Sequence, residues 1–477
     1  MSTDTFRGGL PVLVAAKAAP VVHEEVDGQI VPQLSVSTGS VVGDLAGRLS
    51  VSVVASAATP QDTQLADRHP DGLTVRAAGG QDVRVRFVRH SDETLSQQRY
   101  GLVTEILWQT LHGLWNRWSE PDFGAAERRA WQSLHTLNED FAKELLAQSG
   151  GADQPYLVHD YQLALVPALL RAENPQARIL YFHHIAWPGS DTVELLPDRF
   201  VADLVGGILG ADVVGFFAER WRRNFLRTVE DLVPSVEVDH AAATIRVGDR
   251  VVRAVVEPLS YSPDAITGMV GAWPRELDAW AEDRFLIVHS GRTDPIKNAH
   301  RAVLAFVAAS EHRSVAGARL LLRINPHRMG LAANAGYLKQ VAQVVAEANA
   351  TFGEERVRLL VGNDRGLTVG CLGRADAVVV NSLVDGQNLT AFEAVAVGGR
   401  TPVLLLSPTC GASEVLSVGS LAVNPYDVSD QAEAIVTAVT MASDERAARF
   451  ARMRTGSEDH LLPQWTGRQL RHLEGKE

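Results

Sequence analysis

The stretch from Leu383 to Ala394, LVDGQNLTAFEA, carries residue types that could hold a phosphorylated ligand. It follows the apolar run AVVVNS and opens a helical pattern, so it marks a helix that starts directly after a strand. Gly386 would let the backbone approach a ligand closely. The amides of Gln387, Asn388 and Leu389 would then face phosphate oxygens, because the first N–H groups of a helix have no partner within it.

Two carboxylates and two cations extend this candidate site. Asp385 can accept hydrogen bonds from the hydroxyls of a sugar-like ring, and Glu393, eight residues later, suits a ribose diol. Arg292 and Lys297 share the loop GRTDPIKN and suit a diphosphate, Arg through forked hydrogen bonds and Lys as a point charge. Taken alone, two such cations are usually solvated surface charges, and their neighbours in the fold decide between the two interpretations.

Polar residues also follow other apolar runs of the chain. His159 to Gln162 follow YLV, His183 and His184 follow ILYF, and Asn325 to Arg328 follow LLLRI. Each cluster has a plainer explanation, since an aspartate after a strand caps helices well and adjacent histidines can be buried and hydrogen-bonded. Because five such clusters all stand at strand ends, the sequence predicts one shared ligand site there.

Several common catalytic motifs are missing from the sequence. It has no GxxxxGK[ST] loop, no strand-linked GxGxxG, no GxSxG and no HExxH. A kinase, a dehydrogenase and a zinc protease are therefore disfavoured. We expect a metal-independent transferase with no resident cofactor, for which a nucleotide diphosphate is a substrate.

Short β-branched runs alternate with amphipathic helical patterns along the whole chain, which predicts an α/β fold with parallel sheets covered on both faces. Two such series meet near EPLSYSP, at residues 257–263. We expect two facing Rossmann-like, doubly wound domains with the active site in the cleft between them. The predicted boundaries are an acceptor-binding domain over 1–257, a nucleotide-binding domain over 258–460, and a helix over 461–477 that crosses back to the first domain.

Composition limits the partners of the chain. Its 477 residues are too many for one core, and a net charge of −12 argues against nucleic acid or anionic membrane as the main partner. Only two cysteines occur, Cys371 and Cys410, and neither a signal peptide nor a membrane-spanning run is apparent. We expect a cytoplasmic protein whose partners are small molecules, for which a local basic pocket could bind a phosphorylated one. A homodimer is left open.

Six motifs in order, VHDYQL, FHHIAWPG, SGRTDPIKN, VDGQNLTAFEA, SPTCGASEVL and LAVNPYD, resemble the trehalose-6-phosphate synthase family of retaining glycosyltransferases (GT-B, family 20). The resemblance covers most of the chain. It implies catalytic roles for Asp160, His184, Arg292 and Lys297. The residues that would bind the donor nucleotide are Arg292, Lys297, Asn388, Leu389, Glu393 and Gly39 in a glycine-rich loop. Those that would contact the transferred ring are His184, Asp385, Gly386 and Gln387, and those that would bind the acceptor are Lys17, Trp108, Asp160, Tyr161, Asn325 and Arg328.

The departures from the family pattern lie in or beside the expected pocket. Lys17 stands where an arginine is expected, DGQNL replaces DGMNL, HIAWP replaces HIPFP, and Asn325-Pro326-His327 precedes Arg328. This pattern is similar to the pseudo-glycosyltransferase branch, the validoxylamine A 7′-phosphate synthases. That likeness implies transfer of valienol from GDP to an aminocyclitol phosphate such as validamine 7-phosphate, forming a C–N bond with retention by a front-face mechanism.

Two alternatives stay open at this point. One is a retaining trehalose-6-phosphate synthase that uses a nucleotide glucose and glucose 6-phosphate; the other is a non-catalytic paralogue that binds sugar phosphates. GDP is preferred to UDP through the resemblance alone. Asn363 and Asp364 could meet the N–H donors of guanine, although a surface turn explains them better.

Overall fold

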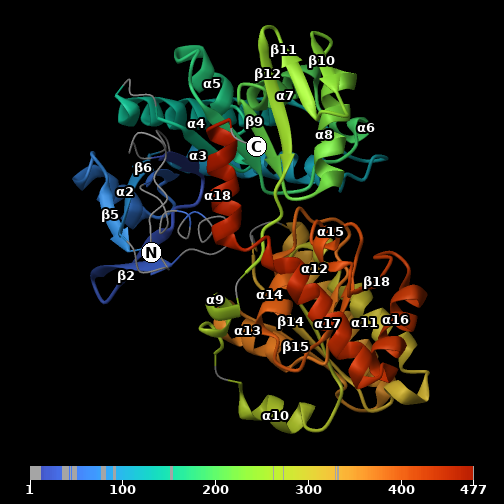
Figure 1. Ribbon diagram of the computed structural model, residues 1–477. Coiled ribbons are helices and arrows are strands. Elements are labelled where there is room, and N and C mark those ends of the chain that lie inside the picture. Colours follow the sequence, from blue (N-terminus) through green and yellow to red (C-terminus); the bar gives the residue numbers. More distant parts are fainter. Residues whose placement is uncertain are drawn as a thin grey trace. The chain divides into compact units, whose positions relative to one another are not determined.

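The computed structural model describes residues 12–34, 42, 45, 51–76, 82–89, 93–150, 154–261, 263–271, 273–327, 329 and 332–475, without the side chains of 93–100, 265 and 332. Gly39 and Arg328 lie outside the described residues. The chain divides into two compact units (Figure 1). The first unit comprises Met1–Glu257 and Leu462–Glu477, and the second comprises Pro258–Leu461.

The first unit contains a sheet of ten strands among the described residues. They are β1 (Val12–Ala16), β4 (Val51–Ser56), β5 (Leu73–Arg76), β6 (Asp82–Val88), β7 (Tyr156–His159), β8 (Ile179–His183), β9 (Val213–Phe216), β10 (Val236–Asp239), β11 (Thr244–Val247) and β12 (Arg250–Val256). Their order is β10-β11-β12-β9-β8-β7-β1-β4-β6-β5. The strands from β12 to β6 run parallel, and β5, β10 and β11 add antiparallel edges.

The direction of winding reverses inside this sheet. From β1 the chain adds β4 and β6 on one side, and then β7, β8, β9 and β12 on the other. The reversal therefore falls between β1 and β7. Ligands of open α/β sheets bind beyond the carboxyl ends of the strands at such a point.

Helices and a separate hairpin complete the first unit. They are β2 (Val21–Val26), β3 (Gln29–Leu34), α2 (Pro60–Arg68), α3 (Glu93–Leu111), α4 (Ala125–Ser149), the 3₁₀ turn η1 (Tyr161–Leu163), α5 (Val166–Glu173), α6 (Ser190–Val193), α7 (Asp198–Ile208), α8 (Glu219–Leu232) and α18 (Leu462–Leu473). Although α18 follows the second unit in the sequence, it contacts β8 and belongs to the first unit. Its red ribbon is labelled in Figure 1.

The helix α18 is fixed to the first unit by its apolar face and by Glu257. The indole of Trp465 is fully buried, lies 5.1 Å from the ring of Phe182, and donates through Nε1 to the Glu257 carbonyl at 3.0 Å. The Glu257 carboxylate pairs with Arg468 and with His472. These contacts make the last helix part of the first unit's core.

The second unit is built on six parallel strands among the described residues. They are β13 (Leu286–Arg292), β14 (Arg319–Asn325), β15 (Val357–Val361), β16 (Ala377–Val380), β17 (Val403–Leu406) and β18 (Leu421–Ala422). The order β15-β14-β13-β16-β17-β18 is the doubly wound order of dinucleotide-binding folds. Its reversal falls between β13 and β16.

Helices cover both faces of this second sheet. They are α9 (Pro263–Thr267), α10 (Arg275–Ala281), α11 (Ala299–Ala309), α12 (Ala332–Phe352), α13 (Arg365–Arg374), α14 (Leu389–Val397), α15 (Ser413–Leu416), α16 (Val428–Thr440) and α17 (Ser443–Glu458), with 3₁₀ turns η2 (Pro295–Lys297) and η3 (Arg313–Val315). Alternate residues of β14 point to opposite faces: Leu320 and Leu322 join the core around Phe306, whereas Leu321 joins the core around Phe392.

The predicted fold class is confirmed, since both units are doubly wound α/β structures. The apolar runs quoted from the sequence form the parallel strands. The antiparallel edges β5, β10 and β11 and the long helix α4 were not expected. Short edge strands with many exposed residues lack the continuous apolar run by which buried parallel strands are recognised.

Candidate active site

The reversal of the second sheet is lined by the residues predicted to hold a diphosphate. Arg292 ends β13 and is the register partner of Asn325, which ends β14. The strand β16 ends at Val380 and leads into the segment that contains Asp385 and Asn388. The loops that follow β13 and β16 thus begin side by side, and from them the chain crosses to opposite sides of the sheet. Ligands of such sheets bind at this edge.

Each of the two predicted cations is paired with a carboxylate of its own unit. Lys297 donates to Oδ2 of Asp385, and the side chain of Asn388 donates to the same oxygen at 2.9 Å. Arg292 lies 3.3 Å from Oδ2 of Asp294. The side chains of Lys297 and Asp385 are 14% and 13% exposed, so this pair is held at a partly dry surface rather than in bulk water.

The backbone beneath Lys297 is shaped to place this side chain. A Cβ on Gly291 would lie 3.0 Å from the Lys297 Cβ, so a larger residue there would crowd it. His289 Nε2 donates to the Lys297 carbonyl at 2.8 Å. Burial lowers the pKa of His289 to about 4, which keeps this imidazole neutral. Asn298 adopts φ 61° and anchors the loop through hydrogen bonds to the carbonyls of Asn381 and Pro425.

The turn before α14 is clamped by the segment after β17. Gly411 donates its N–H to the Asp385 carbonyl at 3.1 Å, and Ala412 donates to the Gln387 carbonyl at 2.7 Å. A Cβ on Gly411 would lie 2.1 Å from the Gly386 oxygen, so the two segments touch backbone to backbone. Asn388 precedes α14 with φ 69°, a left-handed conformation that asparagine tolerates. The Gln387 side chain turns away to the Leu259 carbonyl at 2.8 Å.

The carboxylate expected to meet the ribose, Glu393, is 3% exposed and is not alone. Its Oε1 lies 2.8 Å from the guanidinium of Arg365, the first residue of α13. The sequence analysis missed Arg365, because GNDRGLT resembles an ordinary surface turn. The contact arises from tertiary packing of α13 on α14, which no spacing along the chain reveals.

The reversal of the first sheet gathers a second set of predicted residues. Lys17 follows β1, Asp160 follows β7 and His184 follows β8, and these three strands are neighbours in the sheet. Asp160 has φ 78°, and its side chain accepts from the Tyr161 N–H at 2.9 Å. A positive φ at a residue other than glycine costs free energy, and residues strained in this way cluster at functional sites.

Two histidines meet beside Asp160. His159 Nδ1 and His184 Nε2 lie 3.0 Å apart. Burial lowers the pKa of His159 to about 4; burial and then the nearby His159 lower the pKa of His184 well below its ordinary value. Both rings are therefore neutral near pH 7. Sequence analysis placed His159 in a strand-end cluster without selecting it, since a strand's last residue points into the core as often as to the edge.

A further hydrogen-bond chain fixes the segment after β8. His183 Nε2 donates to the Ala186 carbonyl at 3.2 Å, so its Nδ1 accepts from the Tyr181 hydroxyl at 3.1 Å. Trp108 of α3 lies 6.3 Å from the Tyr161 ring. The two hydrogen bonds of His183 thus fix the start of the loop that contains His184.

The structure brings the predicted residues together in two groups. The first unit holds Lys17, Trp108, Asp160, Tyr161 and His184; the second unit holds Arg292, Lys297, Asn325, Asp385, Gly386, Gln387, Asn388, Leu389 and Glu393. Asn325, predicted to bind the acceptor, therefore lies in the unit with the nucleotide residues. Among the described residues no cluster of three or more His, Cys, Asp or Glu could hold a metal ion. Within the same residues no helix is long and apolar enough to span a bilayer.

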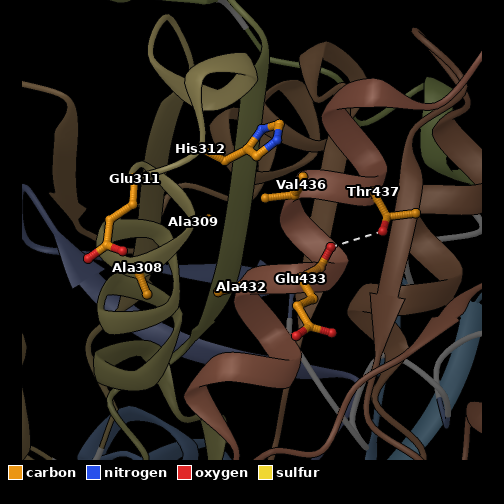
Figure 2. A pocket seen from close by; sticks show the side chains of 8 residues that line it. All are labelled: Ala308, Ala309, Glu311, His312, Ala432, Glu433, Val436 and Thr437. Carbon is orange, nitrogen blue, oxygen red and sulfur yellow. Dashed lines mark hydrogen bonds between the residues drawn. The ribbon is translucent and has the colours of Figure 1, made fainter.

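A pocket of about 590 Å³ lies elsewhere, between α11 and α16 (Figure 2). Its lining includes Ala309, Glu311 and His312 at the end of α11 and Ala432 and Glu433 of α16. These residues lie toward the C-terminal end of α11, away from the strand ends where that helix begins. None of the predicted site residues lines this pocket, so it is separate from the candidate site.

A doubly wound unit that offers cations and a helix start, joined to one that offers a carboxylate and neutral imidazoles, indicates a transferase of the glycosyltransferase type. The model of glycosyltransferase family 20 matches residues 24–475, and the chain belongs to this family.

The chain is similar to several known proteins of this kind. It is 40% identical over 97% of its length to validamine 7-phosphate valienyltransferase of Streptomyces hygroscopicus subsp. jinggangensis, covering 94% of that protein. It is 29% identical to an α,α-trehalose-phosphate synthase [UDP-forming] of Aspergillus niger, covering 76% of each chain. The solved trehalose-6-phosphate synthase OtsA shares the fold with a TM-score of 0.82 at 22% identity, over 98% of this chain and 99% of that one.

Proposed function

We propose that this protein is a pseudo-glycosyltransferase that joins the unsaturated cyclitol of GDP-valienol to the amine of validamine 7-phosphate or a close aminocyclitol phosphate. The observation that carries the proposal is the 40% identity, over 97% of the chain, to a validamine 7-phosphate valienyltransferase. The trehalose-phosphate synthase reaches 29% over 76%. An enzyme of this kind replaces the C–O bond to the donor diphosphate by a C–N bond to the acceptor.

The second unit holds the donor in this proposal. Arg292 and Lys297, with the free amides at the start of α14, stabilise the negative charge that develops on the departing diphosphate. Stabilising charge in the transition state in this way is usually the largest contribution to catalysis. The positive charge left on the ring spreads over the adjacent alkene as an allylic cation. Glu393, held by Arg365, accepts hydrogen bonds from the ribose.

The acceptor amine attacks on the face from which the diphosphate leaves, so configuration is retained. The C–O bond breaks with its electron pair going to the diphosphate, and the nitrogen lone pair forms the new C–N bond. The nitrogen then gives its extra proton to the leaving diphosphate, and GDP is released. No protein nucleophile is needed. Asp160 and His184 orient the reactants, and such positioning can lower a barrier by several kcal/mol.

A competition assay tests this function. Purified protein is incubated with GDP-valienol and validamine 7-phosphate, or with GDP- or UDP-glucose and glucose 6-phosphate, and the products are identified by mass spectrometry. We expect the aminocyclitol product from the first pair and no trehalose 6-phosphate. Trehalose 6-phosphate formed at ordinary turnover would identify a true trehalose-phosphate synthase instead. The same assay on Arg292→Ala should show no turnover, which a non-catalytic binding role would not explain.

The preference for GDP over UDP is a separate part of the proposal. Asp364, one candidate for contacting guanine, accepts the Leu367 N–H at 2.8 Å as the cap of α13. One carboxylate oxygen is therefore already engaged, and the preference rests on the likeness to the family branch. Calorimetric titration with the two nucleoside diphosphates measures it directly. Tighter binding of UDP would reverse the assignment.

A further inference from the structure

The surroundings of the hydrogen bond between His159 and His184 indicate which of the two rings is the donor. The two nitrogens lie 3.0 Å apart, so one must carry hydrogen and the other must offer a lone pair. The other nitrogen of His159, Nε2, is buried and has no hydrogen-bond partner among the described residues. Its surroundings include the indole of Trp465, whose ring lies 6.2 Å from that of His159.

The two arrangements of the proton differ in free energy. If His184 donated, His159 would accept at Nδ1 and carry its own hydrogen on Nε2, as a buried N–H without an acceptor. An orphaned buried donor costs roughly 1–3 kcal/mol, and such groups are rarer in proteins than unsatisfied acceptors. If His159 donates from Nδ1, its Nε2 keeps a bare lone pair, which is the cheaper arrangement. His159 is therefore the donor, and His184 accepts at Nε2.

We propose that His159 is a positioning residue that fixes His184 in the Nδ1–H tautomer and so makes it a neutral hydrogen-bond donor. Neutral His184 has its single hydrogen on Nδ1 once Nε2 accepts from His159. The His184 Nδ1 has no partner within the described residues, and the side chain is partly exposed, so this N–H is available to a ligand. The rings of Phe182 and Phe217 lie 5.1 and 5.3 Å away and hold the imidazole in place.

What the Nδ1–H tautomer of His184 does in the reaction rests on the proposed function. His184 can donate from Nδ1 to the oxygen of a ring hydroxyl. It cannot act as a general base, because Nδ1 already carries a hydrogen and the lone pair of Nε2 accepts from His159. It also brings no positive charge next to the allylic cation. An imidazolium at the same place would oppose the charge that develops on the ring.

Nitrogen spectroscopy tests the tautomer without any substrate. The full-length protein is labelled with ¹⁵N-histidine, and two-bond ¹H–¹⁵N correlations are recorded; the His184 signals are assigned by their loss in His184→Asn. We expect a protonated-type shift for Nδ1 and an unprotonated-type shift for Nε2 of His184. The reverse pattern would overturn the proposal. The result stands whether or not valienyl transfer is ever detected, so it can fail separately from the proposed function.

Two variants of His159 test its role in turnover. The side-chain nitrogen of asparagine takes the place of Nδ1 and can donate, whereas phenylalanine keeps the ring without a donor. We expect His159→Asn to retain kcat within about threefold, and His159→Phe to lower it by about ten- to a hundredfold, with KM for the donor little changed. Equal losses, or no loss in His159→Phe, would refute the role. If His159→Phe does not fold, as judged by circular dichroism, the wild-type tautomer decides.

Discussion

The ion pair between Lys297 and Asp385 joins two side chains to which the proposed function gives different ligands. Lys297 serves the diphosphate and Asp385 serves the ring, yet they are bonded to each other, and Asn388 donates to the same oxygen. A bound diphosphate must compete with Asp385 for the lysine. Once Lys297 turns to the diphosphate, Oδ2 of Asp385 can accept a hydrogen bond from a ring hydroxyl instead.

Asp385→Asn should therefore separate binding from turnover. We expect GDP to bind about three- to tenfold more tightly, because no carboxylate competes for Lys297, while kcat falls by about a hundredfold. Calorimetry and steady-state kinetics measure the two effects. Glu354→Gln removes the partner of Arg319 away from the site and should leave both unchanged. Weaker GDP binding in Asp385→Asn would show that Lys297 holds both anions at once.

Residue types at strand ends were readable from the sequence, but their partners were not. Asp385, Glu393 and Lys297 stood out because acids, amides and cations gathered after apolar runs. Arg365 and His159 did not, since their contacts with Glu393 and His184 join segments that are distant in sequence. A side chain's chemistry is local information, whereas its hydrogen-bond partner is a property of the packed fold.

At the scale of elements, the turn before α14 depends on a close approach of two loops. Gly411→Ala would place a Cβ 2.1 Å from the Gly386 oxygen, so the loop of 385–388 must shift. We expect a loss of about 1–3 kcal/mol in unfolding free energy. GDP affinity, measured by calorimetry, should fall by at least about tenfold. Gly336→Ala in α12, where a Cβ meets nothing within 4 Å, is the matched control.

Strand–helix alternation was enough to predict the doubly wound units, because buried parallel strands are continuously apolar. It could not give the strand order on which the site depends. Whether β16 lies beside β13 or beside β15 depends on how the helices pack on the two faces of the sheet. The apolar cores around Phe306 and Phe392 form in that packing. The position of the reversal point and the direct pairing of Lys297 with Asp385 emerge only from the folded structure.

At the scale of the whole molecule, buried histidines are distributed unequally. Among the described histidines, burial lowers the pKa values of His159, His183 and His184 in the first unit. In the second unit it lowers those of His289 and of the partly buried His300. For His159 the pKa falls from 6.5 unfolded to about 4 folded. The unfolded state therefore binds more protons between these values, and stability that is full above pH 6.5 is lost as pH falls toward 4.

We expect the first unit to open before the second on acidification, each such group contributing up to about 1.4 kcal/mol per pH unit. Hydrogen exchange with mass spectrometry, corrected for intrinsic rates and compared between about pH 7.5 and about pH 5, reports protection in each sheet. Peptides over β7 and β8 should lose more protection than those over β14 and β17. Earlier opening of the second sheet would contradict this.

The role of α18 can be tested with a matched pair of tryptophans. Trp465 is fully buried and Trp118 is 88% exposed, and both belong to the first unit. Trp465→Ala should cost about 3–5 kcal/mol, a large share of a typical domain's stability, while Trp118→Ala should cost almost nothing. Calorimetric unfolding measures both. Equal effects would mean that α18 is not part of the core.

Because α18 belongs to the first unit, the order of translation determines which unit has its complete sequence first. A ribosome releases Pro258–Leu461 before Leu462–Leu473, so the second unit has its whole sequence available while the first still lacks Trp465. Until Leu462–Leu473 are translated, the surface of Phe182 that the Trp465 indole covers stays open to water and to chaperones. The first unit thus starts before the second unit along the sequence and is completed after it.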